Sequence, residues 1–239
     1  MAVRRYERRV KLRRWAAEDW EYAHVSYRFI KATFHHPVRF VSRLNVRGAE
    51  NMPATGPVIL AVNHLSWADP VVVGAAIQRP AFYLAKEGVF HHPVTRWLVT
   101  ATGQIKVDRH TGGNEGAVAT ATALLSHNLV VGIFPEGTRS RPGQVKRGKT
   151  GIARIAAASG APIVPIGCDT GAFWPRGRTL PKLGEPVYIH IGAPLRLDLK
   201  PQDMSDKERM RHATDEVMDR VRELYLDAVR AREGGETWA

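Results

Sequence analysis

Between residues 44 and about 199, short apolar runs alternate with longer stretches of helical periodicity, and this alternation constrains the fold more than any other feature. The apolar runs, which are the candidate strands, lie at 58–62, 82–85, 105–107, 129–134, 163–166 and 187–191. The helical patterns lie near 70–78, 92–101, 115–127 and 149–159. Strands that alternate with helices form largely parallel sheets with helices on both faces. We therefore expect an α/β fold with a largely parallel mixed sheet flanked by helices, in one domain of residues 44–239.

The segment from residue 200 to about 233 has the clearest helical pattern of the chain. Ser205 and Glu208 have the spacing of a capping box at its start, and Gly234 with Gly235 ends it. One apolar stripe runs along this segment: Met210, Ala213, Val217, Val221, Leu224 and Ala228. We expect a C-terminal helix that docks on the α/β domain and carries no chemistry.

Residues 1–43 form a basic, aromatic region of different character. Tyr22, Val25 and Phe29 have helical spacing, and Pro37 is expected to break the helix in two. A basic amphipathic helix that carries tryptophan is typical of a membrane-surface anchor, and each Lys or Arg near an anionic leaflet adds about 1 kcal/mol of attraction. The alternative is a solvated helix that packs its aromatic side chains on the core. Both interpretations stay open on the sequence alone.

The charge balance favours a polyanionic partner, because 35 Lys and Arg residues against 23 Asp and Glu residues give a net charge of +12. Nucleic acid, an anionic membrane surface and phosphorylated substrates all fit this charge. The sequence contains no zinc finger, no RNA-binding aromatic signature and no convincing helix-turn-helix, so we expect no nucleic acid. Cys168 is the single cysteine, which excludes an intramolecular disulfide and a cysteine-based zinc site. Its apolar surroundings predict a buried structural thiol.

A histidine and an acid follow the candidate strand 58–62, in the stretch NHLSWADP. Pro70 suits the first turn of a helix, so the step from His64 to Asp69 is predicted to be a strand-to-helix turn. Such a turn can fold the carboxylate back onto the imidazole. A carboxylate that accepts a hydrogen bond from one ring nitrogen leaves the other nitrogen free as a base. The alternative is that Asp69 is a helix N-cap and His64 a polar loop residue.

Two further motifs follow candidate strands and carry arginines. GQIKVDR ends with Arg109, and FPEGTRS contains Glu136 and Arg139 in a turn with glycine. An arginine fork matches the charged oxygens of a phosphate, and Glu136 could fix the arginine or accept a substrate hydroxyl. The alternative for FPEGTRS is a surface turn with a weak ion pair. Because open α/β sheets bind ligands at the carboxyl ends of their strands, we expect these groups to converge in a site that activates a hydroxyl and holds a phosphate.

In their order and spacing, these motifs resemble those of the glycerolipid acyltransferases of the lysophosphatidic acid acyltransferase (1-acylglycerol-3-phosphate O-acyltransferase) type. The His-x4-Asp block of that family matches His64 and Asp69, and its strand-ending Asp-Arg block matches residues 108–109. The Phe-Pro-Glu-Gly-Thr-Arg-Ser block matches residues 134–140 without a change, and Val-Pro-Ile matches residues 164–166. The resemblance extends from about residue 46 to about residue 192.

One element after the third block matches only in part. The family usually has a Lys-x-Gly element that opens a helix, and Lys146 and Gly148 match it. Lys149 follows where the family leads us to expect a small residue. The resemblance gives this extra charge no role.

The resemblance implies a mechanism and roles for individual residues. His64 would be the general base that removes the proton from the acceptor hydroxyl, and Asp69 would orient the imidazole and stabilise its charged form. The hydroxyl would attack the acyl thioester directly, without a covalent acyl-enzyme. The acceptor's phosphate and glycerol would be bound by Lys86, Arg109, Glu136, Gly137, Thr138 and Arg139. The acyl pocket would be shaped by Val164, Pro165 and Ile166.

The resemblance also implies the substrates and the setting of the reaction. We expect transfer of a fatty acyl group from acyl-CoA or acyl carrier protein to the free hydroxyl of lysophosphatidic acid, giving phosphatidic acid for phospholipid synthesis. No metal and no cofactor are needed. No apolar run approaches the roughly 20 residues of a spanning helix and no signal peptide is recognisable, so we expect a peripheral protein on the cytoplasmic face of the cell membrane. The alternatives are the same chemistry on glycerol 3-phosphate, another lysophospholipid or a glycolipid, and a catalytically idle lipid-binding protein.

Overall fold

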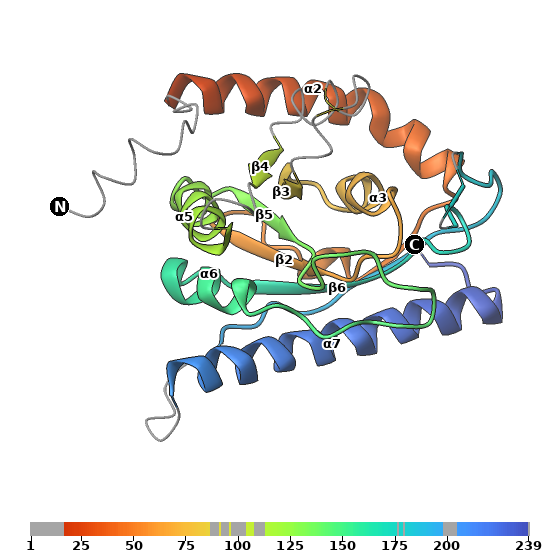
Figure 1. Cartoon of the computed structure of the whole chain (residues 1–239). Coiled ribbons are helices and arrows are strands. Elements are labelled where there is room, and N and C mark those ends of the chain that lie inside the picture. The colour runs from red at the N-terminus through yellow and green to blue at the C-terminus, as the bar shows by residue number, and fades with distance from the viewer. Residues whose placement is uncertain are drawn as a thin grey trace.

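A seven-stranded sheet forms the centre of the computed structural model, which describes residues 17–86, 91, 96, 104–107, 113–175, 177–178, 180–197 and 205–238 (Figure 1). The strand order is β1-β7-β6-β2-β5-β3-β4. The strands are β1 (Asn45–Arg47), β2 (Val58–Val62), β3 (Ala81–Lys86), β4 (Ile105–Val107), β5 (Val130–Ile133), β6 (Ile163–Asp169) and β7 (Tyr188–Ile191). Neighbouring strands are parallel except β6 and β7, which are antiparallel. The predicted α/β fold with a largely parallel mixed sheet is confirmed.

Each of the six apolar runs forms a strand, with bounds that differ by a few residues at most. The short edge strand β1 was not predicted, because its residues form no apolar run. Of the helix expected near 92–101, only Arg96 is described, and it is helical; the rest of that prediction lies outside the described residues.

Helices cover both faces of the sheet and form two hydrophobic clusters with it (Figure 1). α3 (Asp69–Ala76) packs on one face, together with side chains of β2, β6 and β7. α5 (Gly113–Ser126), α6 (Gly151–Ser159) and α7 (Asp206–Gly234) pack on the other face. β2 lies between the two layers with all five residues buried, which explains why its sequence is a continuous apolar run rather than an alternating one. His64 therefore follows the fully buried central strand of the sheet.

α7 docks on the sheet as predicted, and its N-terminus has the predicted capping box. The Ser205 side chain accepts a hydrogen bond from the Glu208 backbone, and the Glu208 side chain accepts one from the Ser205 backbone. The helix comes very close to β6, because a Cβ added at Gly167 would lie 2.2 Å from the carbonyl carbon of Leu224. Any side chain at position 167 would therefore push α7 away from the sheet.

In the described part of the N-terminal region, α2 (Ala17–Val41) is a continuous helix that contains Pro37, so the prediction that Pro37 breaks the helix in two is wrong. Figure 1 shows this helix bending toward its C-terminal end, as a proline inside a helix commonly causes. Tertiary contacts hold the helix together: Tyr27 is buried against Phe82, with ring centroids 5.9 Å apart. The Lys31 ammonium donates hydrogen bonds to carbonyls at the C-terminal end of α3, including that of Gly74 at 3.0 Å. Packing on α3 compensates for the backbone hydrogen bond that Pro37 cannot make.

Candidate active site

His64 and Asp69 form a hydrogen-bonded pair in the turn between β2 and α3. The imidazole Nδ1 lies 2.7 Å from the Asp69 carboxylate, and the imidazole ring stacks on Phe134 with centroids 4.2 Å apart. Nε2 makes no hydrogen bond to any residue that the structure describes, and the imidazole is 19% exposed. The stacking fixes the ring plane, and the carboxylate fixes the tautomer with its proton on Nδ1. Among the described residues, this arrangement leaves Nε2 available as a base.

Asp69 is buried, and the turn is wrapped around its carboxylate. Oδ2 accepts hydrogen bonds from the backbone N–H groups of Leu65 at 2.7 Å and Ser66 at 3.0 Å, in addition to the imidazole. Oδ1 accepts hydrogen bonds from the hydroxyls of Ser66 and Thr170. Asp69 is the first residue of α3, and Ala68 is the N-cap, so the alternative interpretation of Asp69 as a capping residue is wrong. Its charge is stabilised by the turn and directed at His64.

Glu136 is also buried, and its carboxylate holds two segments of the site together. Oε1 accepts a hydrogen bond from the backbone N–H of His64 at 2.8 Å, and Oε2 accepts one from the backbone N–H of Lys146 at 2.9 Å. The Ser140 hydroxyl donates to Oε2 as well. The expected contact between Glu136 and substrate does not fit this geometry, because both oxygens face protein donors. Nor is FPEGTRS a surface turn with a weak ion pair. Glu136 is a positioning residue for the His64 backbone.

The turn after β5 (residues 134–150) contains three cationic side chains beside the His64–Asp69 pair. The Arg139 guanidinium lies over the Trp67 ring, 4.6 Å from its centroid, and the Lys146 ammonium donates to the Arg139 carbonyl at 3.1 Å. Lys149 covers Gly137, where an added Cβ would lie 2.9 Å from the Lys149 Cε. Gly137 has a φ of 68°, which favours glycine. The charge at Lys149, which the resemblance left without a role, therefore lies on the predicted phosphate-binding turn.

The structure tests the other predicted phosphate contacts only in part. Thr138 is exposed at the tip of the same turn. Lys86 is the last residue of β3, whose C-terminal end lies at the same edge of the sheet as those of β2 and β5. Arg109 lies outside the described residues. The contacts of Lys86 and Arg109 with an acceptor phosphate stay predictions.

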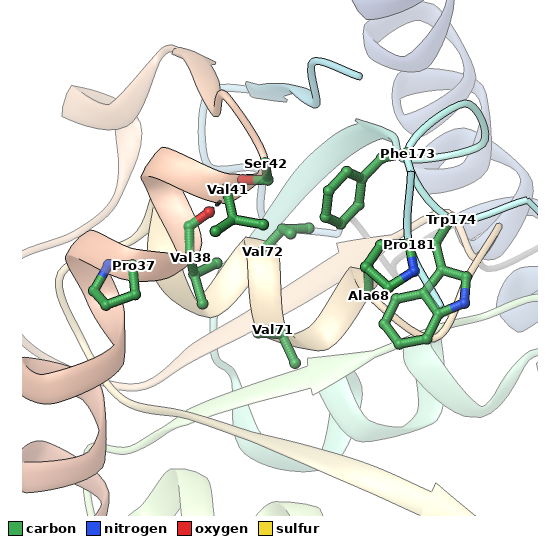
Figure 2. A pocket seen from close by; sticks show the side chains of 10 residues that line it. All are labelled: Pro37, Val38, Val41, Ser42, Ala68, Val71, Val72, Phe173, Trp174 and Pro181. Carbon is green, nitrogen blue, oxygen red and sulfur yellow. Dashed lines mark hydrogen bonds between the residues drawn. The ribbon is translucent and has the colours of Figure 1, made fainter. Parts of the chain in front are cut away.

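Val164, Pro165 and Ile166 are buried within β6 and pack between neighbouring strands. An apolar cavity of about 250 Å³ lies instead on the α3 side of the sheet (Figure 2). It is lined by Pro37, Val38, Val41 and Ser42 of α2, by Ala68, Val71 and Val72 at α3, and by Phe173, Trp174 and Pro181. Ala68 directly precedes Asp69, so the cavity adjoins the turn that holds the His64–Asp69 pair. The residues expected to shape an acyl pocket thus form the sheet behind the site, and other residues line the cavity.

A sequence model of the acyltransferase family matches residues 43–169, which is more than half of the chain and includes both the His64–Asp69 pair and the turn after β5. The chain belongs to the acyltransferase family. It is 30% identical over 151 residues to the 1-acyl-sn-glycerol-3-phosphate acyltransferase of Borreliella burgdorferi, covering 62% of this chain and 60% of the relative. The 1-acyl-sn-glycerol-3-phosphate acyltransferase of Bacillus subtilis is 29% identical over 187 residues, covering 76% of this chain and 87% of the relative.

The fold of this acyltransferase matches that of a solved structure. The crystal structure of the 1-acyl-sn-glycerophosphate (LPA) acyltransferase PlsC from Thermotoga maritima superposes with a TM-score of 0.62, covering 86% of this chain and 95% of that chain at 22% identity. Fold and family therefore agree with the expectation from the four sequence motifs.

Sequence reasoning missed several residues that hold the acyltransferase site in place. Thr170 follows β6 and donates to Asp69, and Ser66 bridges Asp69 and Thr170. The buried Asn63 side chain makes two hydrogen bonds to the backbone of Cys168, at 2.7 and 2.9 Å, and so joins the ends of β2 and β6. Thr170 lies four residues beyond the predicted strand 163–166 and directly follows β6 as observed, so little in the sequence indicated it. Its role depends on the adjacency of β2 and β6, which no local pattern encodes.

Cys168 is buried, as predicted for a structural thiol. Burial raises the pKa of the thiol well above its usual value, and the negative charges of Asp69 and Asp169 raise it further. Within the described ranges, no group of three or more His, Cys, Asp or Glu side chains is arranged to hold a metal ion. In the part of the chain that the structure describes, no helix is both long and apolar enough to cross a membrane.

The role of Thr170 predicts a specific pattern of variants. We expect Thr170→Val to lower kcat by about tenfold, because Asp69 loses a hydrogen-bond donor that holds it against His64. Thr170→Ser, which keeps the hydroxyl, should restore kcat to the wild-type level. Steady-state kinetics of the two variants checks this, and equal losses in both would show that the hydroxyl does not position Asp69.

Proposed function

We propose that this acyltransferase transfers a fatty acyl group from a thioester donor, acyl-CoA or acyl carrier protein, to the free hydroxyl of lysophosphatidic acid, giving phosphatidic acid in phospholipid synthesis. The observation that carries the proposal is the His64–Asp69 pair, in which Nδ1 lies 2.7 Å from a buried carboxylate and Nε2 makes no hydrogen bond to a described residue. The names of the relatives supply the acceptor, since both are 1-acyl-sn-glycerol-3-phosphate acyltransferases.

The chemistry follows from the free ring nitrogen. Nε2 of His64 takes the proton from the acceptor hydroxyl while the hydroxyl oxygen attacks the thioester carbonyl, and Asp69 stabilises the imidazolium that forms. The C–S bond of the resulting tetrahedral intermediate then breaks, and the imidazolium returns the proton to the leaving sulfur. The ester product and the free thiol account for all atoms. His64 ends the cycle neutral, with Asp69 still ionised.

The cations of the turn after β5 would bind the acceptor phosphate. Arg139 offers a planar fork that matches phosphate oxygens, and Trp67 stacks on the guanidinium and limits its motion. Lys146 and Lys149 are exposed and add positive charge to the same turn. Recognition of the phosphate here would bring the glycerol hydroxyl toward His64, because the Ser140 N–H, next to Arg139 in the chain, donates to the His64 carbonyl at 2.6 Å.

Replacing Arg139 by alanine should raise KM for lysophosphatidic acid by about 10- to 100-fold, because a charge-assisted pair with the phosphate is lost. We expect a smaller change in kcat. Arg147→Ala is the matched control, since Arg147 is exposed and pairs with Asp215 of α7 instead. Initial rates over a range of acceptor concentrations check this, and an unchanged KM would remove Arg139 from the phosphate site.

The apolar cavity beside α3 would take an acyl chain. It adjoins the catalytic turn at Ala68, and its other walls come from α2 and from residues 173–181. An apolar chain in this cavity would lie between residues 37–42 of α2 and the side chains of Phe173, Trp174 and Pro181 (Figure 2). This assignment replaces the one expected for residues 164–166.

A lipid acceptor calls for a membrane surface, which we propose is the cytoplasmic face of the cell membrane, with the acyltransferase bound peripherally. The support comes from α2, where Phe29 and Phe40 are 73% and 84% exposed and Phe34 is also exposed. From residue 27 to residue 43 the sequence has four Arg and Lys residues and no acid. Apolar rings among positive charges are typical of interfacial helices.

Replacing Phe29, Phe34 and Phe40 together by serine should therefore weaken binding to anionic vesicles by at least about tenfold, because three exposed rings can no longer insert. The fold should persist, since Tyr27 and Lys31 make the contacts with the core. Vesicle co-sedimentation and thermal unfolding measure the two effects, and Leu226→Ser on α7 serves as the control. Undiminished binding would exclude α2 as the anchor.

One labelled acyl-CoA offered with a panel of acceptors tests the function itself. We expect the label to enter phosphatidic acid from lysophosphatidic acid faster than any other product. If the label is transferred faster to glycerol 3-phosphate, another lysophospholipid or a glycolipid, the proposed reaction chemistry stands and the proposed acceptor is wrong. No transfer to any of them would overturn the proposal.

A further inference from the structure

Two exposed leucines on the β6–β7 loop (residues 170–187) have no role in the site described above. Leu180 is 71% exposed and Leu183 is 75% exposed. The described part of the loop is held in shape from within, because the Trp174 indole donates to the Arg178 carbonyl at 3.0 Å and the Lys182 N–H donates to the Phe173 carbonyl at 2.7 Å. The loop thus presents its leucines to solvent while its aromatic residues face the protein.

The loop lies beside the C-terminal end of α2 (Figure 1). The Arg43 guanidinium donates to the carbonyl of Gly184 at 3.2 Å, and the Val187 N–H donates to the Ser42 carbonyl at 2.9 Å. Phe173, Trp174 and Pro181 line the apolar cavity opposite residues 37–42 of α2 (Figure 2). Leu180 and Leu183 flank Pro181 in the sequence. The loop that carries them therefore forms part of the rim of the cavity, next to the helix end that carries the exposed Phe40.

The charges of this rim fit an anionic surface. Arg43, Arg178 and Lys182 are exposed there. From residue 170 to residue 187 the sequence has three Arg and Lys residues and one acid, Glu185. Apolar side chains surrounded by positive charges are typical of protein surfaces that bind at the boundary between lipid headgroups and acyl chains. At this boundary the leucines would contact the acyl chains, and the cations would contact the lipid phosphates.

We infer that the β6–β7 loop is a second membrane-contact element, which inserts Leu180 and Leu183 into an anionic phospholipid bilayer alongside α2. This inference rests on the proposed function at a lipid surface. Contact at both the loop and α2 orients the cavity between them toward the bilayer, so that an acyl chain passes from lipid to His64 without crossing water. The occupant of this surface is the bilayer, rather than an acidic carrier protein or a second copy of the chain.

A fluorescent probe at position 183 tests the insertion directly. Because the single native cysteine is buried, Leu183→Cys can be labelled selectively with an environment-sensitive dye. We expect a blue shift and increased emission when vesicles of mixed phosphatidylcholine and phosphatidylglycerol are added. The matched control is Leu226→Cys, which is on α7 on the other face of the sheet and should show no change. An unchanged spectrum at position 183 while the labelled protein co-sediments with the vesicles would overturn the inference.

A binding measurement without a probe complements this test. The variant Leu180→Ser with Leu183→Ser should bind the same vesicles about tenfold more weakly or worse, while Leu226→Ser binds like wild type. Turnover of detergent-dispersed lysophosphatidic acid should stay at the wild-type level in all variants. The inference would be overturned if the double variant bound vesicles like wild type. Loss of binding to acyl carrier protein would then indicate the carrier protein as the occupant, and a shift from dimer to monomer would indicate a second copy of the chain. Failure of wild type itself to bind vesicles would refute the membrane proposal, and this inference with it.

Discussion

We expect that replacing His64 by alanine will lower kcat for acyl transfer to lysophosphatidic acid by about 10²- to 10⁴-fold, the usual contribution of a positioned general base. The loss should fall on kcat rather than on KM, because in the proposed mechanism the imidazole acts on the proton of the acceptor hydroxyl while the proposed phosphate contacts lie on the turn after β5. Asp69 keeps its backbone and hydroxyl donors in the variant, so its carboxylate stays satisfied and the turn keeps its shape. Steady-state kinetics and thermal unfolding measure the two effects.

His64→Asn is the control for this experiment, since an amide can still donate a hydrogen bond to Asp69 but cannot take a proton from the substrate at neutral pH. We expect the asparagine variant to be as inactive as the alanine variant. A variant of either kind that retains substantial turnover would show that His64 is not the base.

Replacing Glu136 by glutamine has the second largest expected effect. The amide NH₂ of glutamine donates hydrogen bonds, whereas the carboxylate oxygen that it replaces accepts them. The backbone and hydroxyl donors that this oxygen had satisfied are left unpaired, and each unpaired group lowers the free energy of unfolding by about 1–3 kcal/mol. The backbone of His64 loses its fixed position, so we expect kcat to fall by about tenfold or more while KM for lysophosphatidic acid changes little. Chemical denaturation and initial rates measure both changes. Glu216→Gln, at an exposed position on α7, is the control.

The Glu136 variant also decides between positioning and substrate binding. A side chain that bound the acceptor directly would raise KM when replaced and would leave the unfolding free energy unchanged. That outcome would contradict the positioning role inferred from the buried carboxylate and its three hydrogen bonds.

Much of the fold and of the site could be predicted because local patterns determine them. The strands of a sheet covered on both faces must be continuous apolar runs, and β2 and β5 are buried along their whole length. The capping box at Ser205 likewise depends on residues three positions apart. His64 and Asp69 are close in sequence, so the turn that joins them follows from Pro70 and the preceding strand. Predictions succeeded where the determining residues are neighbours in the chain.

The errors arose where distant segments decide the outcome. Glu136 looked like a ligand for substrate, but the backbone of His64, seventy-two positions earlier, occupies its Oε1. Pro37 was predicted to break the helix, but α2 continues past Pro37 because it packs on α3. Thr170 carried no motif at all, and its contact with Asp69 exists because β6 pairs with β2. In each case a tertiary contact overrides or supplies what the local pattern cannot encode.

The most direct test of the His64–Asp69 mechanism is a rapid-quench experiment with labelled acyl-CoA. Wild-type protein is mixed with the donor, first alone and then with lysophosphatidic acid, and the label is followed in protein, free fatty acid and phosphatidic acid. Direct transfer by a general base predicts no label on the protein and the appearance of labelled phosphatidic acid only after the acceptor is added. Label that accumulates on the protein before the acceptor is present, or that passes to water alone, would contradict it.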